Sequence, residues 1–509
     1  MPTIGSTLRA TASRVPDRRA LVHGSVHYTY AELDAAVDQY AAVLAARGVA
    51  KGSRVALLAH NSDLFVVAFY AIHRIGAIFV PLNPALAVPE IKHIVRDCRV
   101  TVLLFEPTSE EKVRALLSED LGGPLDCLAL GLADGFDDLS ALAKRQPADF
   151  ADISVGERDD AQILYTSGTT GLPKGALFDH HRALWVAVSC IATCGLKDGD
   201  RLLHAAPLYH AAALCLMLIP GTLVGATHIV ERSFDAAAVA DRLERERVTM
   251  FFGVPTMYQF LLRTPQIAER DMSAWRTGIF GAAPMPASTV EALVETFPAL
   301  NLIQLCGQTE AGPSGIFSAG DQVRRRPDAS GRQAMLGMQC RIVSEDGRDV
   351  APGNAGELLL RGETVMKGYW NNPAETARTI VDGWLHTGDV CRLDDDGYMT
   401  LVDRIKDMII TGGRNVYCVE VEGAIAGHPD VLDVAVIGRP HRDYGESIVA
   451  FIRPAPGATV TLEQLRDFAA EHIARYKLPH DVVLIDEIPR NASGKIVKRS
   501  LRELAERRC

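Results

Sequence analysis

In the first half of the chain, segments with helical periodicity alternate with short runs of continuously apolar residues. A capping box at residues 29–32 begins one such helical segment, whose apolar residues share one face until Gly48. Runs that are typical of buried strands follow at residues 54–59, 77–81 and 100–105. Because parallel strands are buried on both faces, this alternation predicts an α/β fold with a mainly parallel sheet covered by helices.

Near residue 336 the pattern changes and becomes rich in strands and turns. A hairpin is predicted over residues 341–361, and an acidic turn at residues 394–397 precedes a short strand. The run of Asp residues lacks the Glu spacing of an EF-hand, so a turn is favoured over calcium binding. Farther on, a smaller α+β segment is expected, with strands and a helix at residues 434–437, 448–452 and 462–473.

The chain length sets the expected number of domains. Its 509 residues exceed what one hydrophobic core usually serves, so at least two domains are expected. We predict a large N-terminal domain over residues 1–403, with mainly parallel sheets and a β-rich subdomain. A small α+β domain is predicted over residues 407–509.

The charge balance argues against nucleic acid as a partner. The formal net charge is -10, whereas phosphate contacts need clustered Lys and Arg. The run Arg324–Arg326 is too short to change this conclusion, and we interpret it as a solvated loop.

Cysteine usage and apolar segments bear on the compartment. Ten cysteines occur without a CxxC pair, and the closest two, Cys190 and Cys194, are expected to pack in the core rather than to bind a metal. Scattered cysteines without a signal peptide predict a cytoplasmic protein. The longest apolar stretches, residues 64–72 and 211–219, are too short to span a bilayer, so no transmembrane segment is expected.

The most informative motif is the polar, glycine-rich run from Tyr165 to Gly175, which follows an apolar strand at residues 161–164. Its glycines allow the backbone to approach a ligand closely, and its hydroxyls together with Lys174 suit phosphate groups. The order of residues differs from that of a Walker A loop. A polar loop without a ligand is the alternative, and the unbroken run that ends in Lys174 disfavours it.

This run resembles the phosphate loop of the adenylate-forming superfamily, in particular of its acyl-CoA synthetases and its fatty-acid and aryl-CoA ligases. Further segments resemble family motifs in the family's order: Pro207–His210, Gly281–Pro284, Cys306–Glu310, Thr387–Asp389, Asp403–Asp407 and Pro489–Lys495. The resemblance extends over nearly the whole chain. It implies a large N-terminal domain, a small mobile C-terminal domain and an active site between them.

The resemblance also implies a reaction. A carboxylic acid attacks ATP to give an acyl-adenylate and pyrophosphate, and the acyl group then passes to coenzyme A. Two anions must meet in the first step, so cations and amide donors have to be placed in advance. The implied nucleotide-binding residues are Thr166, Ser167, Gly168, Thr169, Thr170, Gly171, Lys174, Gly281, Ala282, Ala283, Gln308, Thr309, Asp389, Arg404 and Lys495.

Within this set, the resemblance assigns individual roles. Thr166 and Glu310 would hold Mg²⁺, and Lys174 would bind the β- and γ-phosphates. Asp389 would accept hydrogen bonds from the ribose hydroxyls, while Arg404 would reach the ribose or a phosphate.

Catalytic roles follow in the same way for four residues. Lys495 would stabilise the charge that develops during adenylation, and Glu310 would act through the magnesium ion. His210 would line the entrance to the acyl site. Lys406, in a hinge over residues 404–406, would be the point about which the small domain rotates between the two half-reactions.

The expected substrate is a long or bulky acid. Small residues at 211–213 and 281–283 leave room near His210, and no Asp follows His210 where amino-acid-activating relatives bind an α-ammonium group. The main alternative is an enzyme that hands its acyl-AMP to a carrier protein or a separate ligase. A non-catalytic nucleotide- or acyl-binding protein and a luciferase-like monooxygenase are further alternatives, and a homodimer is left open.

Three positions depart from the family pattern. Cys306 replaces the Tyr that usually stacks on adenine, which removes an aromatic platform. Arg414 replaces a Glu, and Cys418 replaces a Pro, in a loop that in relatives faces the acyl site after the small domain rotates. We expect both residues to tune the thioester step or acyl selection, and we expect the loss of proline to free the backbone at position 418.

Overall fold

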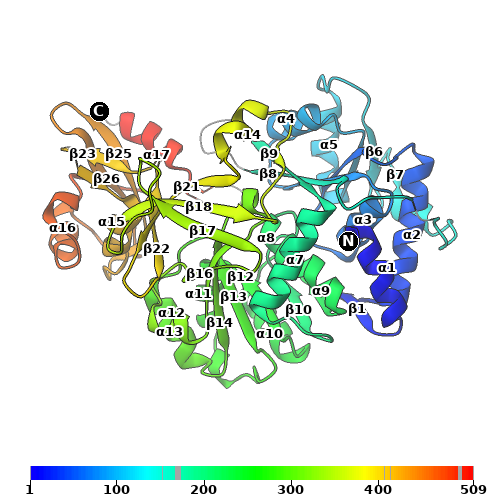
Figure 1. Ribbon diagram of the computed structural model, residues 1–509, viewed down its shortest axis with the longest axis horizontal. Coiled ribbons are helices and arrows are strands. Elements are labelled where there is room, and N and C mark those ends of the chain that lie inside the picture. The colour runs from blue at the N-terminus through cyan, green and yellow to red at the C-terminus, as the bar shows by residue number, and fades with distance from the viewer. Residues whose placement is uncertain are drawn as a thin grey trace. The chain divides into compact units, whose positions relative to one another are not determined.

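A computed structural model of the chain describes residues 2–151, 153–166, 173–405, 407–412, 414–490 and 496–507 (Figure 1). The residues form two compact units. Unit 1 comprises residues 1–340 and 360–385, and unit 2 comprises residues 341–359 and 386–509. The predicted division of the chain at residues 403–407 stays a prediction.

Unit 1 contains a nine-stranded sheet. Its strand order is β16 (Gln333–Ala334), β15 (Gly315–Ala319), β14 (Asn301–Gly307), β13 (Thr277–Gly281), β12 (Met250–Gly253), β10 (Arg201–His204), β11 (Thr227–Val230), β1 (Arg19–His23) and β2 (Val26–Thr29). The pairs from β14 through β13, β12, β10 and β11 to β1 are parallel, whereas β15, β16 and β2 add antiparallel edges.

An eight-stranded sheet is the second layer-forming element of unit 1. Its strand order is β19 (Gly368–Tyr369), β9 (Lys174–Asp179), β8 (Asp160–Thr166), β4 (Ile78–Leu82), β3 (Arg54–Leu58), β5 (Val102–Phe105), β6 (Asp126–Ala129) and β7 (Asp137–Asp138). The pairs from β8 to β7 are parallel, and β8 and β9 form an antiparallel hairpin.

The helices of unit 1 lie between these strands in the sequence. They are α1 (Ile4–Arg14), α2 (Tyr30–Ala46), α3 (Asp63–Arg74), α4 (Val88–Cys98), α5 (Glu110–Leu117), α6 (Leu139–Ala143), α7 (His180–Cys194), α8 (Ala211–Ala213), α9 (Ile219–Val224), α10 (Ala236–Arg245), α11 (Pro255–Leu262), α12 (Ala287–Thr296), α13 (Asp321–Arg325) and α14 (Pro373–Thr379). A π-helical turn at Leu214–Leu218 joins α8 to α9.

Each sheet of unit 1 has its own apolar core. Residues of α10, α11, α12 and α13 pack on β10, β12 and β13 around Phe251 and Tyr258, and Figure 1 shows these helices in green beside the same strands. Residues of α4 and α5 pack on β3, β4 and β5 around Leu103 and Phe105. The mainly parallel, helix-covered architecture predicted from the alternation is therefore confirmed.

Unit 2 contains a sheet with the order β24 (Arg414–Val416), β23 (Ile409–Thr411), β26 (Gly445–Pro454) and β25 (Val431–His441), with β27 (Asp481–Leu484) beside β26. Alternate residues of β25 and β26 face opposite sides. One side packs on α15 (Cys418–Ala426) and α16 (Leu462–Ala470), and the other packs on α17 (Lys498–Glu506). Two small cores thus enclose one sheet.

Three further strands carry residues of both units because the boundary between the units passes through them. They are β17 (Met338–Val343), β18 (Ala355–Gly362) and β21 (Trp384–Leu393). Within unit 2, β21 pairs with β22 (Met399–Arg404), and Asp394 caps the predicted acidic turn between them by accepting from the amide of Tyr398 at 2.8 Å. The short β20 (Ile380–Val381) belongs to unit 1.

Most local predictions are confirmed. The capping box at Thr29 begins α2, and the predicted strands correspond to β3, β4, β5, β25 and β26. Cys190 and Cys194 are both buried, as expected. One interpretation is wrong: Arg324 and Arg325 are exposed, but they end the helix α13 rather than lying in a loop. Within the described part of the chain, no helix combines the length and apolarity that crossing a bilayer requires.

Candidate active site

The candidate residues of unit 1 follow the carboxyl ends of strands. Thr166 ends β8, Gly281 ends β13 and Gly307 ends β14. β13 and β14 are parallel neighbours with Gly281 opposite Leu305, so the segments that follow them leave the sheet at one edge. The carboxyl edge of a parallel sheet is where α/β proteins usually bind their ligands.

Backbone packing at this edge admits only glycine at two positions. A Cβ atom on Gly281 would lie 2.3 Å from the carbonyl oxygen of Leu305. One on Gly307 would lie 2.3 Å from that of Ser314. The next residue after Gly281, Ala282, has a φ of 67°, a left-handed conformation that is strained for alanine. The predicted adenine segment Gly281–Ala283 is thus a tight, strained turn, as is common at ligand sites.

A cluster of charged side chains lies where β9, β19 and α14 meet. The ammonium group of Lys174 forms an ion pair with Glu375 and lies 5.0 Å from the centre of the Tyr369 ring. The Tyr369 hydroxyl donates to Glu310 Oε1 at 2.9 Å. A backbone hydrogen bond also holds Glu310 in place, because the amide of Met366 donates to the carbonyl oxygen of Glu310 at 2.8 Å. Tyr369 therefore contacts both Lys174 and Glu310.

The electrostatics of this cluster follow from its pairing. The hydrogen bond from Lys174 holds the pKa of Glu375 below its usual value, and Arg378 acts in the same direction from 2.6 Å. Burial raises the pKa of Tyr369, and the negative charge of Glu310 raises it further. Tyr369 is therefore a neutral donor, and Glu375 is a charged carboxylate that compensates Lys174.

The residues around Glu310 form a tight turn. Gln308 precedes a 3₁₀ turn at Thr309–Ala311, and Gly312 closes it with its amide donating to the Thr309 carbonyl oxygen at 2.9 Å. Cys306, in β14 just before this turn, is half-buried and faces Ile316 of β15 in register. A thiol therefore stands where the resemblance expects an aromatic ring.

The segment that carries His210 is held by a buried asparagine. Asn61 is 1% exposed; its side-chain amide donates to the carbonyl oxygens of Ala206 at 3.0 Å and His204 at 3.4 Å. Its carbonyl oxygen accepts from the amide of Leu208 at 2.7 Å. The His210 ring lies edge-on to Tyr209 at 4.8 Å, and the helix that begins at Ala211 continues into the π-helical turn.

In unit 2, the two predicted ribose ligands lie next to each other. Asp389 of β21 and Arg404 of β22 are partners in the antiparallel register, and Arg404 Nε lies 2.9 Å from Asp389 Oδ1. Asp389 is 7% exposed, whereas the Arg404 side chain is 38% exposed. The ion pair orients the Asp389 carboxylate, and the Arg404 guanidinium remains partly exposed to solvent.

Cys418 does not occupy the environment predicted for it. It is buried and is the first residue of α15, rather than a loop residue. Its amide donates to the carboxylate of Asp403, and its thiol lies 2.9 Å from the carbonyl oxygen of Asp407. The expectation that losing proline frees the backbone here is wrong, because the amide that proline lacks is used. Arg414, in contrast, is exposed, with its guanidinium 4.8 Å from the centre of the Tyr476 ring.

Comparison with known proteins places this arrangement in a family. The model for AMP-binding enzymes matches residues 8–370, and the model for the AMP-binding enzyme C-terminal domain matches residues 420–495. The chain belongs to the AMP-binding enzyme family. The predicted membership in the adenylate-forming superfamily is thereby confirmed.

Relatives of this AMP-binding enzyme match over almost its whole length. A feruloyl-CoA synthase from an Amycolatopsis species is 39% identical, with 98% of each chain covered. The long-chain-fatty-acid–CoA ligase FadD13 of Mycobacterium tuberculosis is 36% identical, with 99% of this chain and 98% of the relative covered. A crystal structure of the anthranilate CoA ligase AuaEII with anthranoyl-AMP has a TM-score of 0.92 at 28% identity, covering 99% of this chain and 97% of that one. The predicted enzyme class, an AMP-forming acid–thiol ligase, is confirmed.

Several predicted site residues of this AMP-binding enzyme lie outside the described residues. They are Ser167, Gly168, Thr169, Thr170 and Gly171 of the phosphate loop, the hinge residue Lys406 and the catalytic Lys495. Their assigned roles stay predictions. The described residues on either side of the loop, Thr166 and Lys174, are register partners in the β8–β9 hairpin.

The predicted metal ligands carry oxygen donors, which magnesium prefers. Within the described part of the chain, no three His, Cys, Asp or Glu side chains gather as a metal site. Thr166 and Glu310 instead offer single hydroxyl and carboxylate oxygens. Mg²⁺ commonly takes one or two protein oxygens and completes its shell with phosphates and water. The donor chemistry of the two residues suits a nucleotide-bound magnesium ion, and their role as its ligands stays a prediction.

Sequence reasoning missed Tyr369, Glu375 and Asn61. The only local signal near the first two was Asn372-Pro373, which marks the start of α14 and places Glu375 in its first turn. Asn61 precedes Ser62, the N-cap of α3, so it too stood beside a helix-start signal. The contact of Tyr369 with Glu310 spans 59 residues of sequence, and the contacts of Glu375 with Lys174 and of Asn61 with residues 204–208 span more than 140. No periodic pattern in the sequence indicates such contacts.

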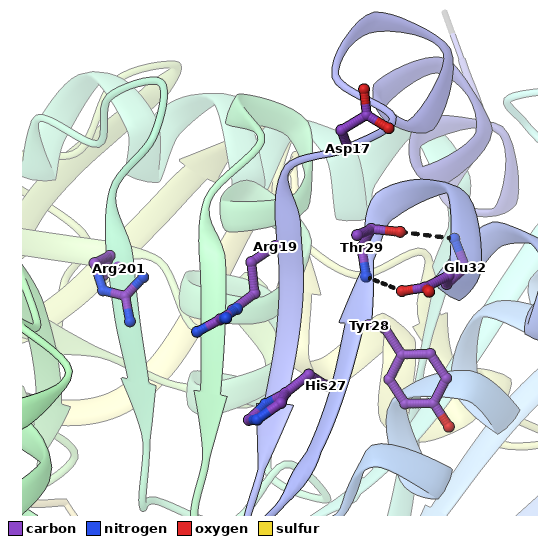
Figure 2. A pocket seen from close by; sticks show the side chains of 7 residues that line it. All are labelled: Asp17, Arg19, His27, Tyr28, Thr29, Glu32 and Arg201. Atoms are coloured by element: carbon purple, nitrogen blue, oxygen red, sulfur yellow. Dashed lines mark hydrogen bonds between the residues drawn. The ribbon is translucent and has the colours of Figure 1, made fainter.

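A separate polar pocket of about 440 Å³ opens on unit 1, and Figure 2 shows the residues that line it. Arg19 begins β1 and Arg201 begins β10, so the pocket lies at the amino ends of these strands. The candidate site follows the carboxyl ends of β13 and β14. The pocket in Figure 2 is therefore distinct from the predicted nucleotide site.

Proposed function

We propose that this enzyme activates a long or bulky carboxylic acid with ATP and Mg²⁺ and then transfers the acyl group to coenzyme A, releasing AMP and pyrophosphate. The observation that carries the proposal is the contact of Tyr369 with both Lys174 and Glu310. These are the cation assigned to the phosphates and the carboxylate assigned to magnesium. Because both side chains contact Tyr369, the cation for the phosphates and the carboxylate for the magnesium ion of a nucleoside triphosphate lie close together.

The chemistry demands such an arrangement. A carboxylate is a poor electrophile, and its attack on the α-phosphate brings two anions together. Lys174 offsets charge on the β- and γ-phosphates, and Thr166 and Glu310 hold Mg²⁺, which when bound neutralises phosphate charge. Lys495, by resemblance, stabilises the charge near the α-phosphate during adenylation. A preorganised charge donor of this kind is worth roughly a hundredfold or more in rate.

The acid is a bulky aryl-containing acid or a long fatty acid. The named relatives act on ferulate and on long-chain fatty acids, and none of the supporting features favours acetate. Small side chains at Ala211–Ala213 follow His210 directly, which leaves room beside the ring that we assign to the acyl entrance.

The predicted ribose ligands and the mobile small domain complete the reaction in this proposal. Asp389 and Arg404 bind the ribose and an adjacent phosphate, and their 2.9 Å pairing supports a shared role. Lys406 is the hinge about which the domain turns before thioester formation. We place the enzyme in the cytoplasm, since its ten cysteines are scattered along the chain without CxxC pairs. Light scattering decides between a monomer and the homodimer that the sequence leaves open.

The experiment is a substrate panel with and without coenzyme A. Ferulate, a long-chain fatty acid, acetate and an amino acid are each incubated with ATP and Mg²⁺, and acyl-AMP, pyrophosphate and acyl-CoA are quantified. Without coenzyme A, we expect acyl-AMP from ferulate and the long-chain fatty acid but not from acetate or the amino acid. With coenzyme A, we expect the same two acids to give acyl-CoA. Acyl-AMP without thioester for every accepted acid would replace this function by the carrier-protein alternative.

The matched variant is Lys495→Ala. It should slow acid-dependent pyrophosphate exchange by roughly a hundredfold or more, while thioester formation from supplied acyl-AMP continues. Near-normal exchange in this variant would remove Lys495 from the adenylation step.

A further inference from the structure

We propose that α4 is a positioning element for the β8–β9 hairpin, with His93 and Asp97 as its positioning residues; this rests on the proposed function of the hairpin in nucleotide binding. The hairpin presents Thr166 at the end of β8 and Lys174 at the start of β9. α4 belongs to no motif that carries the family resemblance, and it contacts the residue before each of these two.

The first contact is at the β9 side. Nε2 of His93 lies 3.1 Å from the carbonyl oxygen of Pro173, the residue immediately before Lys174. A carbonyl oxygen only accepts, so Nε2 of His93 is the donor. The imidazole therefore fixes the peptide that leads directly into Lys174.

The second contact is at the β8 side. The hydroxyl of Tyr165, the residue before Thr166, donates to the carboxylate of Asp97, and it lies 3.1 Å from the sulfur of Cys98. Burial raises the pKa of Tyr165, and the neighbouring Cys98 and Asp97 raise it further, so the phenol keeps its proton and remains a donor. Gly175, its partner in the hairpin, leaves room for the ring: a Cβ there would lie 3.0 Å from the Tyr165 ring.

Helix geometry explains how one element reaches both sides. His93 and Asp97 are four residues apart and so share one face of α4. The opposite face, with Ile91, Ile94 and Val95, is buried against β3, β4 and β5. The helix is therefore anchored in the core, while its polar face contacts both sides of the hairpin next to the loop.

The same helix also fixes the strand that carries Tyr369. The backbone carbonyl oxygen of Asp97 accepts from Trp370 Nε1 at 3.1 Å and from Asn371 Nδ2 at 2.8 Å. The amide of Trp370 in turn donates to the carbonyl oxygen of Gly175 at 2.7 Å. α4 thus sets the spacing between the hairpin and Tyr369, the residue that contacts Lys174 and Glu310.

The test uses variants of His93 with a matched control on the same helix. His93→Leu removes the donor, His93→Gln keeps a side-chain N–H, and Lys92→Leu alters a neighbouring residue whose ammonium pairs with Glu119 instead. Binding of a non-hydrolysable ATP analogue is measured by calorimetry on the full chain. We expect His93→Leu to weaken binding roughly 3- to 10-fold, the scale of one hydrogen bond, with recovery in His93→Gln and no change in Lys92→Leu.

A second variant keeps the proposal testable if His93→Leu does not fold. Tyr165→Phe removes the hydroxyl on the β8 side of the hairpin and should weaken analogue binding to a similar extent. Wild-type affinity in both folded variants, or an equal loss in Lys92→Leu, would overturn the role of α4. The readout needs no acid substrate, so a wild type that binds the analogue but makes no acyl-AMP refutes the proposed function alone.

Discussion

At the scale of single residues, Glu375 and a bound triphosphate compete for the ammonium group of Lys174. Its ammonium group is paired with Glu375, and the two side chains are 27% and 22% exposed. A triphosphate that binds Lys174 must displace this carboxylate or share the cation with it. The ion pair therefore opposes nucleotide binding by roughly the strength of a partly exposed pair, about 0.2 to 1 kcal/mol.

Glu375→Gln should consequently tighten the binding of an ATP analogue by roughly 1.5- to 5-fold, while Lys174→Met should weaken it. Titration calorimetry measures both. Glu363→Gln serves as the control, because its carboxylate pairs with His181 and not with Lys174. Weaker binding in Glu375→Gln would mean that Glu375 orients Lys174 rather than competing for it.

Cys418 gives a second residue-scale prediction. The buried carboxylate of Asp403 accepts from the amides of Cys418 and Arg404, and burial raises its pKa to about 6 despite the nearby ammonium of Lys498. Cys418→Pro removes one of these donors and should lower the free energy of unfolding of unit 2 by about 1 to 3 kcal/mol. Cys418→Ser keeps the amide and should cost less. Scanning calorimetry tests this order, and equal losses in the two variants would contradict it.

The residue-scale lesson is about which contacts a sequence encodes locally. Glycine at positions 281 and 307 could be predicted to matter because the motifs around them resemble a known family. The pairing of Lys174 with Glu375 could not, because 201 residues separate the partners and only the folding of β19 beside β9 brings them together. The role of Cys418 was mispredicted because its hydrogen bonds to Asp403 and Asp407, 15 and 11 residues earlier, leave no periodic pattern in the sequence.

At the scale of elements, the segment of residues 204–210 depends on one side chain. Asn61 satisfies two carbonyl oxygens and one amide of this segment in a buried site. Its removal would take away the side-chain partner of the Ala206 carbonyl oxygen and of the Leu208 amide, whereas the carbonyl oxygen of His204 still accepts from the amide of Glu231 at 3.0 Å. The segment leads to His210, so its displacement should alter the acyl entrance more than the nucleotide site.

Asn61→Ala should therefore raise the KM for the acid more than the KM for ATP, by a factor of about 5 to 10. Steady-state kinetics with each substrate varied in turn provides the measurement. Asn83→Ala is the matched control, since Asn83 is also buried but accepts only from the amide of Ala85. An equal rise in both KM values would show that Asn61 supports the fold of unit 1 rather than the acyl segment.

Elements with strong local patterns were the ones that the sequence predicted well. The capping box and the apolar face of α2, and the continuous apolar runs of β3 to β5, are each contained in fewer than twenty residues. β25 and β26 extend to 11 and 10 residues, beyond their predicted apolar centres, because the polar residues at their ends are held by cross-strand pairing. The helix at Asp321–Arg325 escaped prediction because it spans only five residues.

At the scale of the whole molecule, each unit has cores of its own, so each is expected to respond to perturbation separately. Unit 1 carries the four tryptophans, at positions 185, 275, 370 and 384. Trp384 begins β21, which continues into unit 2, and the other three lie away from this boundary, so tryptophan fluorescence reports mainly the unfolding of unit 1. The pH dependence of the unfolding of unit 1 can therefore be measured by this signal.

Unit 1 buries a set of histidines that folding keeps neutral. Burial lowers the pKa of His73 to about 3, of His180 to about 4 and of His204 to about 3, and it also lowers the pKa of His228. His204 Nε2 lies 2.9 Å from His228 Nδ1, so protonating one would place a charge against the other in the core. Each ring charges readily only after unfolding.

The stability of unit 1 should consequently fall as the pH drops below about 6.5, because the unfolded chain binds protons that the folded unit does not. Above pH 6.5 the free energy of unfolding keeps its full value. From near pH 6 down towards the folded pKa, each such histidine lowers it by about 1.4 kcal/mol per pH unit. Urea unfolding followed by tryptophan fluorescence at pH 7.5, 6.0 and 5.0 measures this slope. His73→Leu should reduce it by about one such increment, whereas His472→Leu, at an exposed position in unit 2, should leave it unchanged. An unaltered slope in folded His73→Leu would show that His73 is protonated in the native state or shielded in the unfolded one.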